Sequence, residues 1–122
     1  MPPRPHADRF PTGVLNVNKP AGDTSFSVVN RLRRLTGAHK VGHAGTLDPL
    51  ATGVLPILFE SATRLAEFAL QLEKTYVADV HFGFTTATDD AESEVEAVGD
   101  PSHLTTAAVE AALHGFVGKI LQ

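Results

Sequence analysis

The chain of 122 residues contains no cysteine, which excludes disulfide bonds and thiolate metal sites. No apolar run approaches the ~20 residues that a membrane-spanning helix needs. Residues 1–12, MPPRPHADRFPT, are rich in proline and lack the apolar core of a secretory signal, so we expect a flexible leader there. These absences favour a cytoplasmic protein without a membrane partner.

Charged residues make up only 20% of the chain, and their two signs are unevenly spread. Residues 1–64 carry eight Lys or Arg against four Asp or Glu, a balance of +4, whereas residues 65–122 carry two against ten, a balance of −8. One basic face turned toward nucleic acid would explain this asymmetry, and so would an acidic solubilising surface on the second half. Charge alone favours the second explanation.

The first half of the chain shows two regular patterns. Residues 13–20 alternate apolar and polar side chains and stop at a proline, which predicts a short strand. Residues 25–37 predict a helix with Thr24 or Ser25 as its N-cap and Gly37 as its C-terminal stop. The apolar positions at helical spacing are Phe26, Val29, Leu32 and Leu35.

The second half predicts an alternation of helices and strands. Residues 53–59 are apolar but contain Pro56, which favours an edge strand or an irregular core segment. Residues 61–72 predict a helix with Ser61 as its cap, in which Leu65, Phe68, Ala69 and Leu72 keep the helical period. A strand over 74–84, a polar turn over 85–93, a return strand over 94–98 and a helix over 104–122, starting near Thr105, complete the order. The pattern predicts an α+β (mixed α/β) domain.

The stretch KVGHAGTLDPLATGVLP, residues 40–56, is an apolar loop with a single acid, Asp48. Its neighbour Pro49 pushes the backbone of Asp48 toward extended geometry. An isolated Asp-Pro more often caps a turn through its side chain than reacts. The residues alone leave both roles open.

Other candidate sites are weakly supported. His39 and His43 are four residues apart, but the glycine between them disfavours the helix that a zinc pair needs. Gly42, Gly45 and Gly53 match neither a Walker loop nor a dinucleotide fingerprint. The cluster TTATDDAES does not match a calcium loop. We therefore predict no metal.

The stretches GVLNVNKPAGDTS and GHAGTLDPLATGVLPI resemble the TruB family of tRNA pseudouridine synthases. The similarity continues through EKTYVADVHFG and TTATDDAES and runs from Gly13 to the last residue. It implies an isomerase that converts uridine 55 in the T arm of tRNA to pseudouridine without a cofactor. It also implies a catalytic domain with a mainly antiparallel sheet flanked by helices, and we expect a monomer.

The resemblance assigns roles to four residues. Asp48 matches the catalytic aspartate, and His43 matches the loop histidine that packs against the flipped-out nucleotide. Tyr76 matches the aromatic residue that lies against the target uracil, and Lys19 matches the lysine that supports the active-site loop. We expect the apolar loop to keep water away from Asp48, and its glycines to let RNA approach closely.

One further motif bears on the resemblance. Thr86, Thr88 and Asp90 match a T-x-T-x-D turn of the family, whereas Ser93 stands where the family usually has glycine. Apart from the resemblance, four basic residues flank the loop and could contact RNA phosphates or form a solvated helix face: Arg31, Arg33, Arg34 and Lys40.

The family's arginine that keeps the catalytic aspartate charged lies beyond residue 122. We therefore expect residues 13–122 to be the N-terminal part of a catalytic domain in a longer protein, inactive or nearly so alone. Two alternatives stay open: a non-catalytic RNA-binding or tRNA-chaperone module, and a metal-binding or nucleotide-binding fragment.

Overall fold

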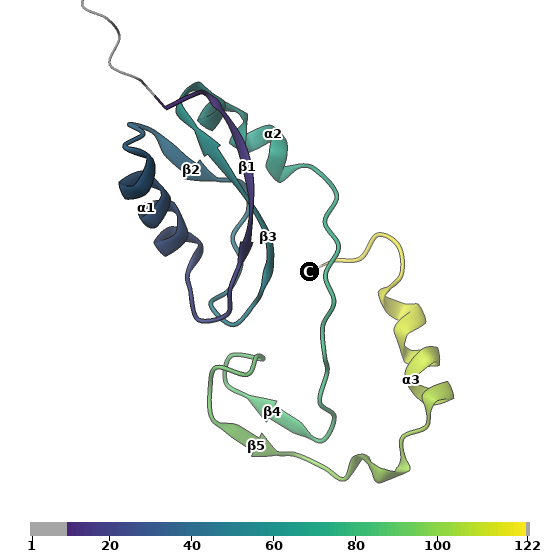
Figure 1. The fold of residues 1–122 in the computed structure, drawn as a ribbon. Helices are drawn as coiled ribbons and strands as arrows, with labels where there is room; N and C mark the ends of the chain where they lie inside the picture. The colour runs from purple at the N-terminus through teal and green to yellow at the C-terminus, as the bar shows by residue number, and fades with distance from the viewer. Residues whose placement is uncertain (1–9, 122) are drawn as a thin grey trace, which may run out of the picture. The chain divides into compact units, whose positions relative to one another are not determined.

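The computed structural model describes residues 10–121 (Figure 1). Backbone contacts divide the chain into two units, Met1–Tyr76 and Val77–Gln122. The expected flexible leader, residues 1–12, lies mostly outside the described residues. Of its last residues, Phe10 packs its ring against Phe59, with the ring centroids 4.6 Å apart.

The first unit is built on a three-stranded antiparallel sheet in the order β1-β3-β2. Strand β1 covers Gly13–Lys19, as the sequence predicts, β2 covers Val41–His43, and β3 covers Gly53–Phe59. Lys19 pairs with Gly53, and His43 pairs with Ile57. The last residues of β1 and β2 and the first residue of β3 therefore point to one end of the sheet, which residues 44–52 close.

Strand β3 is the central strand, so the prediction of an edge strand or irregular segment is wrong. Pro56 lacks an N–H, but its position makes that loss harmless. Strand β2 ends at His43 opposite Ile57, and the carbonyl of Pro56 accepts a hydrogen bond from the N–H of Ala44 at 3.0 Å. The missing donor thus falls just beyond the last paired residue of β2.

Helix α1 covers Ser25–Thr36, close to the predicted range. Thr24 is the N-cap, since its hydroxyl oxygen accepts the N–H of Ser27 at 3.0 Å. Gly37 ends the helix in the left-handed region at φ 67°.

The buried face of α1 differs from the predicted one. Of the predicted positions, Val29 is buried and Leu32 partly buried, whereas Phe26 and Leu35 are exposed, and Val28 is buried in addition. The spacing of one and four residues from Val28 also puts three side chains on one helical face. The core that this face joins consists of Val28, Val29, Ala38, Val41, Leu55, Ile57 and Phe59.

The predicted helix over 61–72 is shorter and begins differently. A 3₁₀ turn covers Glu60–Leu65, and α2 covers only Ala66–Leu70, without the predicted serine cap. Leu65, Phe68 and Leu72 are exposed. The buried contacts are made by small side chains that lie close to the other face of the sheet: Ala62, Ala66 and Ala69, against Ala44 and Leu58.

Glu60 sets the sharp turn between β3 and this segment. It has a φ of 53°, unusual for a residue with a side chain. Its N–H donates to the carbonyl of Lys40 at 2.8 Å, and its carboxylate accepts the N–H of His39 at 2.7 Å. These bonds tie the entry of β2 to the exit of β3.

The predicted strand over 74–84 is wrong for most of its length. Residues 73–81 have no regular structure, and strand β4 begins only at Phe84. Alternating side chains make a strand only when a neighbour pairs with its backbone. Among the described residues no strand pairs with 74–83, and Val77 is 98% exposed.

The second unit contains a hairpin and a helix. Strand β4, Phe84–Thr86, lies mostly within the predicted polar turn, and it pairs antiparallel with β5, Val95–Ala97, which falls in the predicted return strand. A 3₁₀ turn covers Pro101–His103, α3 covers Thr106–Leu113, and a further 3₁₀ turn covers His114–Phe116. Helix α3 starts next to Thr105 as predicted, with Thr105 as its N-cap, but it stops at Leu113, before two glycines of which Gly118 has a φ of 95°.

Antiparallel strands beside separate helices give the α+β fold that the sequence predicts. Within residues 10–121 no helix has the length and apolar character to cross a membrane.

Replacing Ile57 by alanine tests the core of the first unit. Ile57 is completely buried in β3, so we expect the free energy of unfolding to fall by about 2–5 kcal/mol. Urea unfolding followed by far-UV circular dichroism measures it. Val54→Ala is the control, because Val54 lies in the same strand with its side chain 65% exposed. Equal losses for the two variants would contradict this core.

Candidate functional site

Lys19 is a fully buried cation at the end of β1. Its ammonium group donates three hydrogen bonds to backbone carbonyls: to Asp23 at 2.6 Å, Pro20 at 3.0 Å and Pro49 at 3.2 Å. Three is the full donor count of a lysine, which offsets the cost of burying its charge. The turn after β1 and the loop of Asp48 are thereby joined at one point.

Two further contacts hold the residues on either side of Asp48. The N–H of Gly22 donates to the carbonyl of Pro49 at 2.7 Å. The hydroxyl of Ser25 donates to the carbonyl of Leu47 at 3.1 Å and accepts the N–H of Leu47 at 2.9 Å. Leu47 and Pro49 are therefore each fixed to the segment 19–25.

Asp48 itself is exposed in the described structure. Its carbonyl accepts the N–H of Ala51 at 3.0 Å and closes a turn, so the backbone takes the role that a capping side chain would have. None of the described residues donates a hydrogen bond to its carboxylate. The result is a carboxylate presented to solvent on a fixed backbone.

The prediction that the apolar loop keeps Asp48 dry is wrong within the described residues. Leu47 turns inward and packs against the core, and Leu50 is 43% exposed. Neither side chain covers the carboxylate. Leu47 anchors the loop in the core instead.

His43 lies in β2, so the first residues of the predicted loop are a strand. Its Nδ1 lies 2.6 Å from the carbonyl oxygen of Gly45. A neutral ring that donates from Nδ1 presents Nε2 as a hydrogen-bond acceptor. The bond fixes the ring five residues before the aspartate.

Gly45 and Gly53 need glycine for their backbones, with φ of 97° and 129°. Gly42 does not, since an added Cβ would meet only a methyl group of Thr63, at 3.9 Å. A Cβ on Gly45 would lie 3.8 Å from Cε of Lys74. Lys74 donates to the carbonyls of Leu70 and Leu72 at the end of α2, and its side chain passes beside the backbone of Gly45.

Tyr76 is not fixed near Asp48 in this structure. Its side chain is 67% exposed, and no strand holds its backbone. Two of the four basic residues, Arg31 and Arg33, make polar contacts. Arg31 lies 4.0 Å from the carboxylate of Asp23, and the guanidinium of Arg33 donates to the carbonyl of Val41 at 3.4 Å. Arg34 and Lys40 are exposed.

In the second unit, the T-x-T-x-D turn forms a network of hydrogen bonds. The hydroxyl of Thr86 donates to the carbonyl of Asp90 at 2.7 Å, and the hydroxyl of Thr88 donates to its carboxylate. Ser93, where the family usually has glycine, adds a bond at 2.8 Å to the hydroxyl of Thr88. This substitution extends the network.

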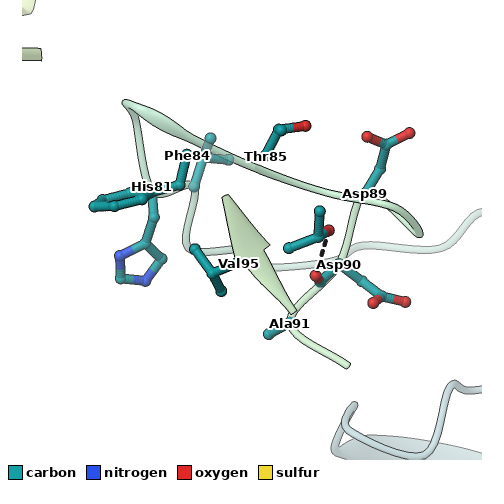
Figure 2. A pocket seen from close by; sticks show the side chains of 9 residues that line it. His81, Phe84, Thr85, Asp89, Asp90, Ala91 and Val95 are labelled. Atoms are coloured by element: carbon teal, nitrogen blue, oxygen red, sulfur yellow. Dashed lines mark hydrogen bonds between the residues drawn. The ribbon is translucent and has the colours of Figure 1, made fainter. Parts of the chain in front are cut away.

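The hydroxyl of Thr88, and then the N–H of Glu92, hold the pKa of the Asp90 carboxyl below its ordinary value. Figure 2 shows Asp89 and Asp90 beside a hollow whose other side carries His81, Phe84 and Val95. Within the described part of the chain, no three His, Asp or Glu side chains are grouped so that they could hold a metal ion.

Residues 33–122 match the family described as TruB family pseudouridylate synthase (N terminal domain). The chain belongs to this family. tRNA pseudouridine synthase B of Syntrophotalea carbinolica is 50% identical over 107 residues, which cover 88% of the chain and 35% of that relative. The enzyme of the same name from Mycobacteroides abscessus is 51% identical over 110 residues, covering 90% of the chain and 37% of that relative. The chain thus spans just over a third of the length of these curated relatives.

Among solved structures, an H/ACA RNP bound to a substrate RNA containing 2'-deoxyuridine contains a chain that is 46% identical. The match covers 46% of the present chain and 18% of that chain, with a TM-score of 0.45.

Sequence reasoning did not find two of the contacts that build this site. Ser25 was expected only as a possible helix cap, and Lys74 was not singled out. A lysine just after a helix is a known C-terminal signal, because its ammonium group can bond the last carbonyls. The clamp of Ser25 on Leu47 joins residues 22 positions apart and leaves no local signal.

Replacing Lys19 by methionine tests the buried cation. The change leaves three carbonyls without their donor, so we expect the free energy of unfolding to fall by at least about 2 kcal/mol. Hydrogen exchange at the N–H groups of Gly22 and Leu47 should accelerate, because their bonds, to Pro49 and to Ser25 respectively, both join this loop to residues 22–25. Lys40→Met, at an exposed lysine, should change stability by less than about 0.5 kcal/mol. Unchanged exchange in Lys19→Met would exclude Lys19 as the anchor of the loop.

Replacing Thr88 by valine removes the main cause of the lowered pKa of Asp90. We expect that pKa to rise toward its ordinary value, as measured by NMR titration of the side-chain carboxyl carbon. A lowered folded-state pKa adds stability above the unfolded pKa, and this contribution is lost as the pH falls through the folded pKa. In the variant this contribution should be smaller, and its loss should be complete at a higher pH. Thr85→Val, at an exposed neighbour in β4, should leave the titration unchanged, and a shift of equal size there would argue against the hydroxyl as the cause.

Proposed function

We propose that the protein isomerises uridine in the T arm of tRNA, at position 55, to pseudouridine, with Asp48 as its essential residue. Family membership and relatives named tRNA pseudouridine synthase B support this proposal. The observation that carries it is the fixed backbone on both sides of an exposed carboxylate. The carboxylate oxygens of a structural aspartate would instead accept hydrogen bonds from nearby backbone N–H groups.

The reaction needs few groups. The bond from C1′ to N1 of uracil breaks, the base rotates, and a bond from C5 to C1′ forms, while C5 loses a proton and N1 gains one. The product is an isomer, so no oxidant, water or cofactor is consumed. The carboxylate of Asp48 acts toward the sugar, either as nucleophile or as base. Holding it in place before the substrate arrives reduces the entropic cost of reaching the reactive geometry.

A uridine inside folded RNA must leave its stack before its sugar can be reached, at a cost of about a few kcal/mol. We assign Tyr76 to stack on the extruded uracil, which is worth roughly 1–3 kcal/mol. This requires the extended segment around Tyr76 to become ordered on the loop. His43, whose ring is held by Gly45, offers Nε2 to a polar group of the flipped nucleotide or its neighbours.

We place the activity in the whole protein, because the chain spans just over a third of the length of its curated relatives. The family's arginine that holds the catalytic aspartate charged matches no residue of this chain. We further propose that the protein acts in the cytoplasm as a monomer.

A second candidate function is RNA binding without catalysis, as in a tRNA chaperone. The arginines on the surface of α1 favour it, since a basic helix face contacts phosphates regardless of any reaction. The two functions differ in their dependence on Asp48.

Replacing Asp48 by asparagine separates them. Asparagine keeps the shape of the side chain but lacks the charge, so we expect pseudouridine formation in T-arm RNA to fall by at least about a thousandfold. RNA binding should change little. The measurement is mass spectrometry of the RNA after incubation with the whole protein. Asp79→Asn, at an exposed acid, should retain full activity, and full activity in Asp48→Asn would exclude the proposed reaction mechanism.

A further inference from the structure

Helix α1 carries a shallow hollow lined by Ser27, Asn30, Arg33 and Arg34. Three of these residues follow the spacing of three and four positions that keeps side chains on one face of a helix. The hollow is therefore a continuous polar strip on the outer side of the helix whose opposite side packs Val28 and Val29 into the core.

The groups in this hollow are suited to an anion. The guanidinium of Arg33 is steadied by its bond to the carbonyl of Val41 and keeps further N–H donors. Among residues 10–121, no carboxylate lies within 4.0 Å of Arg33 or Arg34, whereas Arg31 is engaged by Asp23. The side-chain amide of Asn30 is half-buried and makes no hydrogen bond with the described residues. Ser27 lines the hollow without offering a donor, since its hydroxyl bonds the carbonyl of Thr24.

The hollow lies on the same helix that positions the aspartate loop. Ser25 begins α1 and holds Leu47. Arg34 follows nine residues later, which is about 14 Å along a helix. Charges along a nucleic acid backbone repeat every few ångströms, so an RNA with one nucleotide at Asp48 has phosphates within this range.

We propose that Asn30, Arg33 and Arg34 form a binding site for a backbone phosphate of the RNA whose uridine is placed at Asp48. The ligand class is a phosphodiester, gripped by the planar guanidinium groups and the amide of Asn30. The site reads no base and sets the position of the RNA along α1. This inference rests on the proposed function for the identity of the RNA.

The test is fluorescence anisotropy with a labelled T-arm hairpin RNA, titrated with the protein at several KCl concentrations. Arg34→Ala should weaken binding about tenfold at low salt. It should also reduce the slope of log K against log salt by roughly 0.7–0.9, the value for one lost phosphate contact. Arg34→Lys should keep the slope and lose part of the affinity. Asn30→Ala should lower the affinity and keep the slope, because it removes no charge.

The control is Arg64→Ala, at an exposed arginine outside the hollow that carries the same charge change. It should leave affinity and slope close to those of the unchanged protein. An unrelated hairpin of equal length should lose as much affinity from Arg34→Ala as the T-arm RNA, because the site reads only the backbone. Equal effects of Arg34→Ala and Arg64→Ala, or an unchanged slope in Arg34→Ala, would overturn the site.

Failure of the proposed function has a different signature. A protein that shows these slopes but forms no pseudouridine would retain the phosphate site and lose the catalytic assignment. If pseudouridine forms but Arg34→Ala does not change RNA binding, the catalytic assignment stands and the phosphate site is excluded.

Discussion

The ammonium group of Lys19 holds together the parts of the molecule that matter most for function. It is buried without a carboxylate partner within the described residues, and three carbonyls from two loops surround it. The charge keeps these loops together because each carbonyl that moved away would leave the cation less well solvated. The exit of β1, the entry of α1 and the turn of Asp48 therefore share one electrostatic centre. The contacts of Ser25 and Gly22 reinforce a geometry that this centre already requires.

Local signals in the sequence predicted strand β1, the capped helix α1, the return strand β5 and the start of α3, which follow from periodicity and capping residues. The sheet partner of β1 is the distant strand β3, which local signals do not reveal. The central position of β3 could not be read locally, because Pro56 is harmless only where β2 ends. The alternation over 74–84 resembled a strand, but pairing depends on a neighbour that periodicity does not reveal. Of the alanines that pack against the sheet in this segment, only Ala69 belonged to the predicted pattern, because larger apolar residues dominated it.

The candidate site, like the fold, was predicted only in part from the sequence. Local chemistry favoured a turn cap for Asp48, and only the resemblance to a family singled it out as catalytic. The structure shows the turn and gives the capping role to the backbone, which leaves the carboxylate available. Its exposure was not expected, because the apolar residues of the loop were predicted to shield it, whereas Leu47 packs into the core and Leu50 is exposed. The clamp residues lie 22 to 30 positions from their partners, so only the folded chain reveals them.

The adjacent hydroxyl groups of Thr24 and Ser25 have different structural roles. Thr24 caps the first turn of α1, and Ser25, one residue later, clamps Leu47. Fraying of that first turn would move Ser25 and release the loop, so helix end and aspartate loop form one cooperative opening unit. How firmly the loop holds the carboxylate of Asp48 then depends on the stability of a helix terminus, which is the part of a helix that usually opens first. A substitution on the solvent side of α1 can in this way alter the site without touching it.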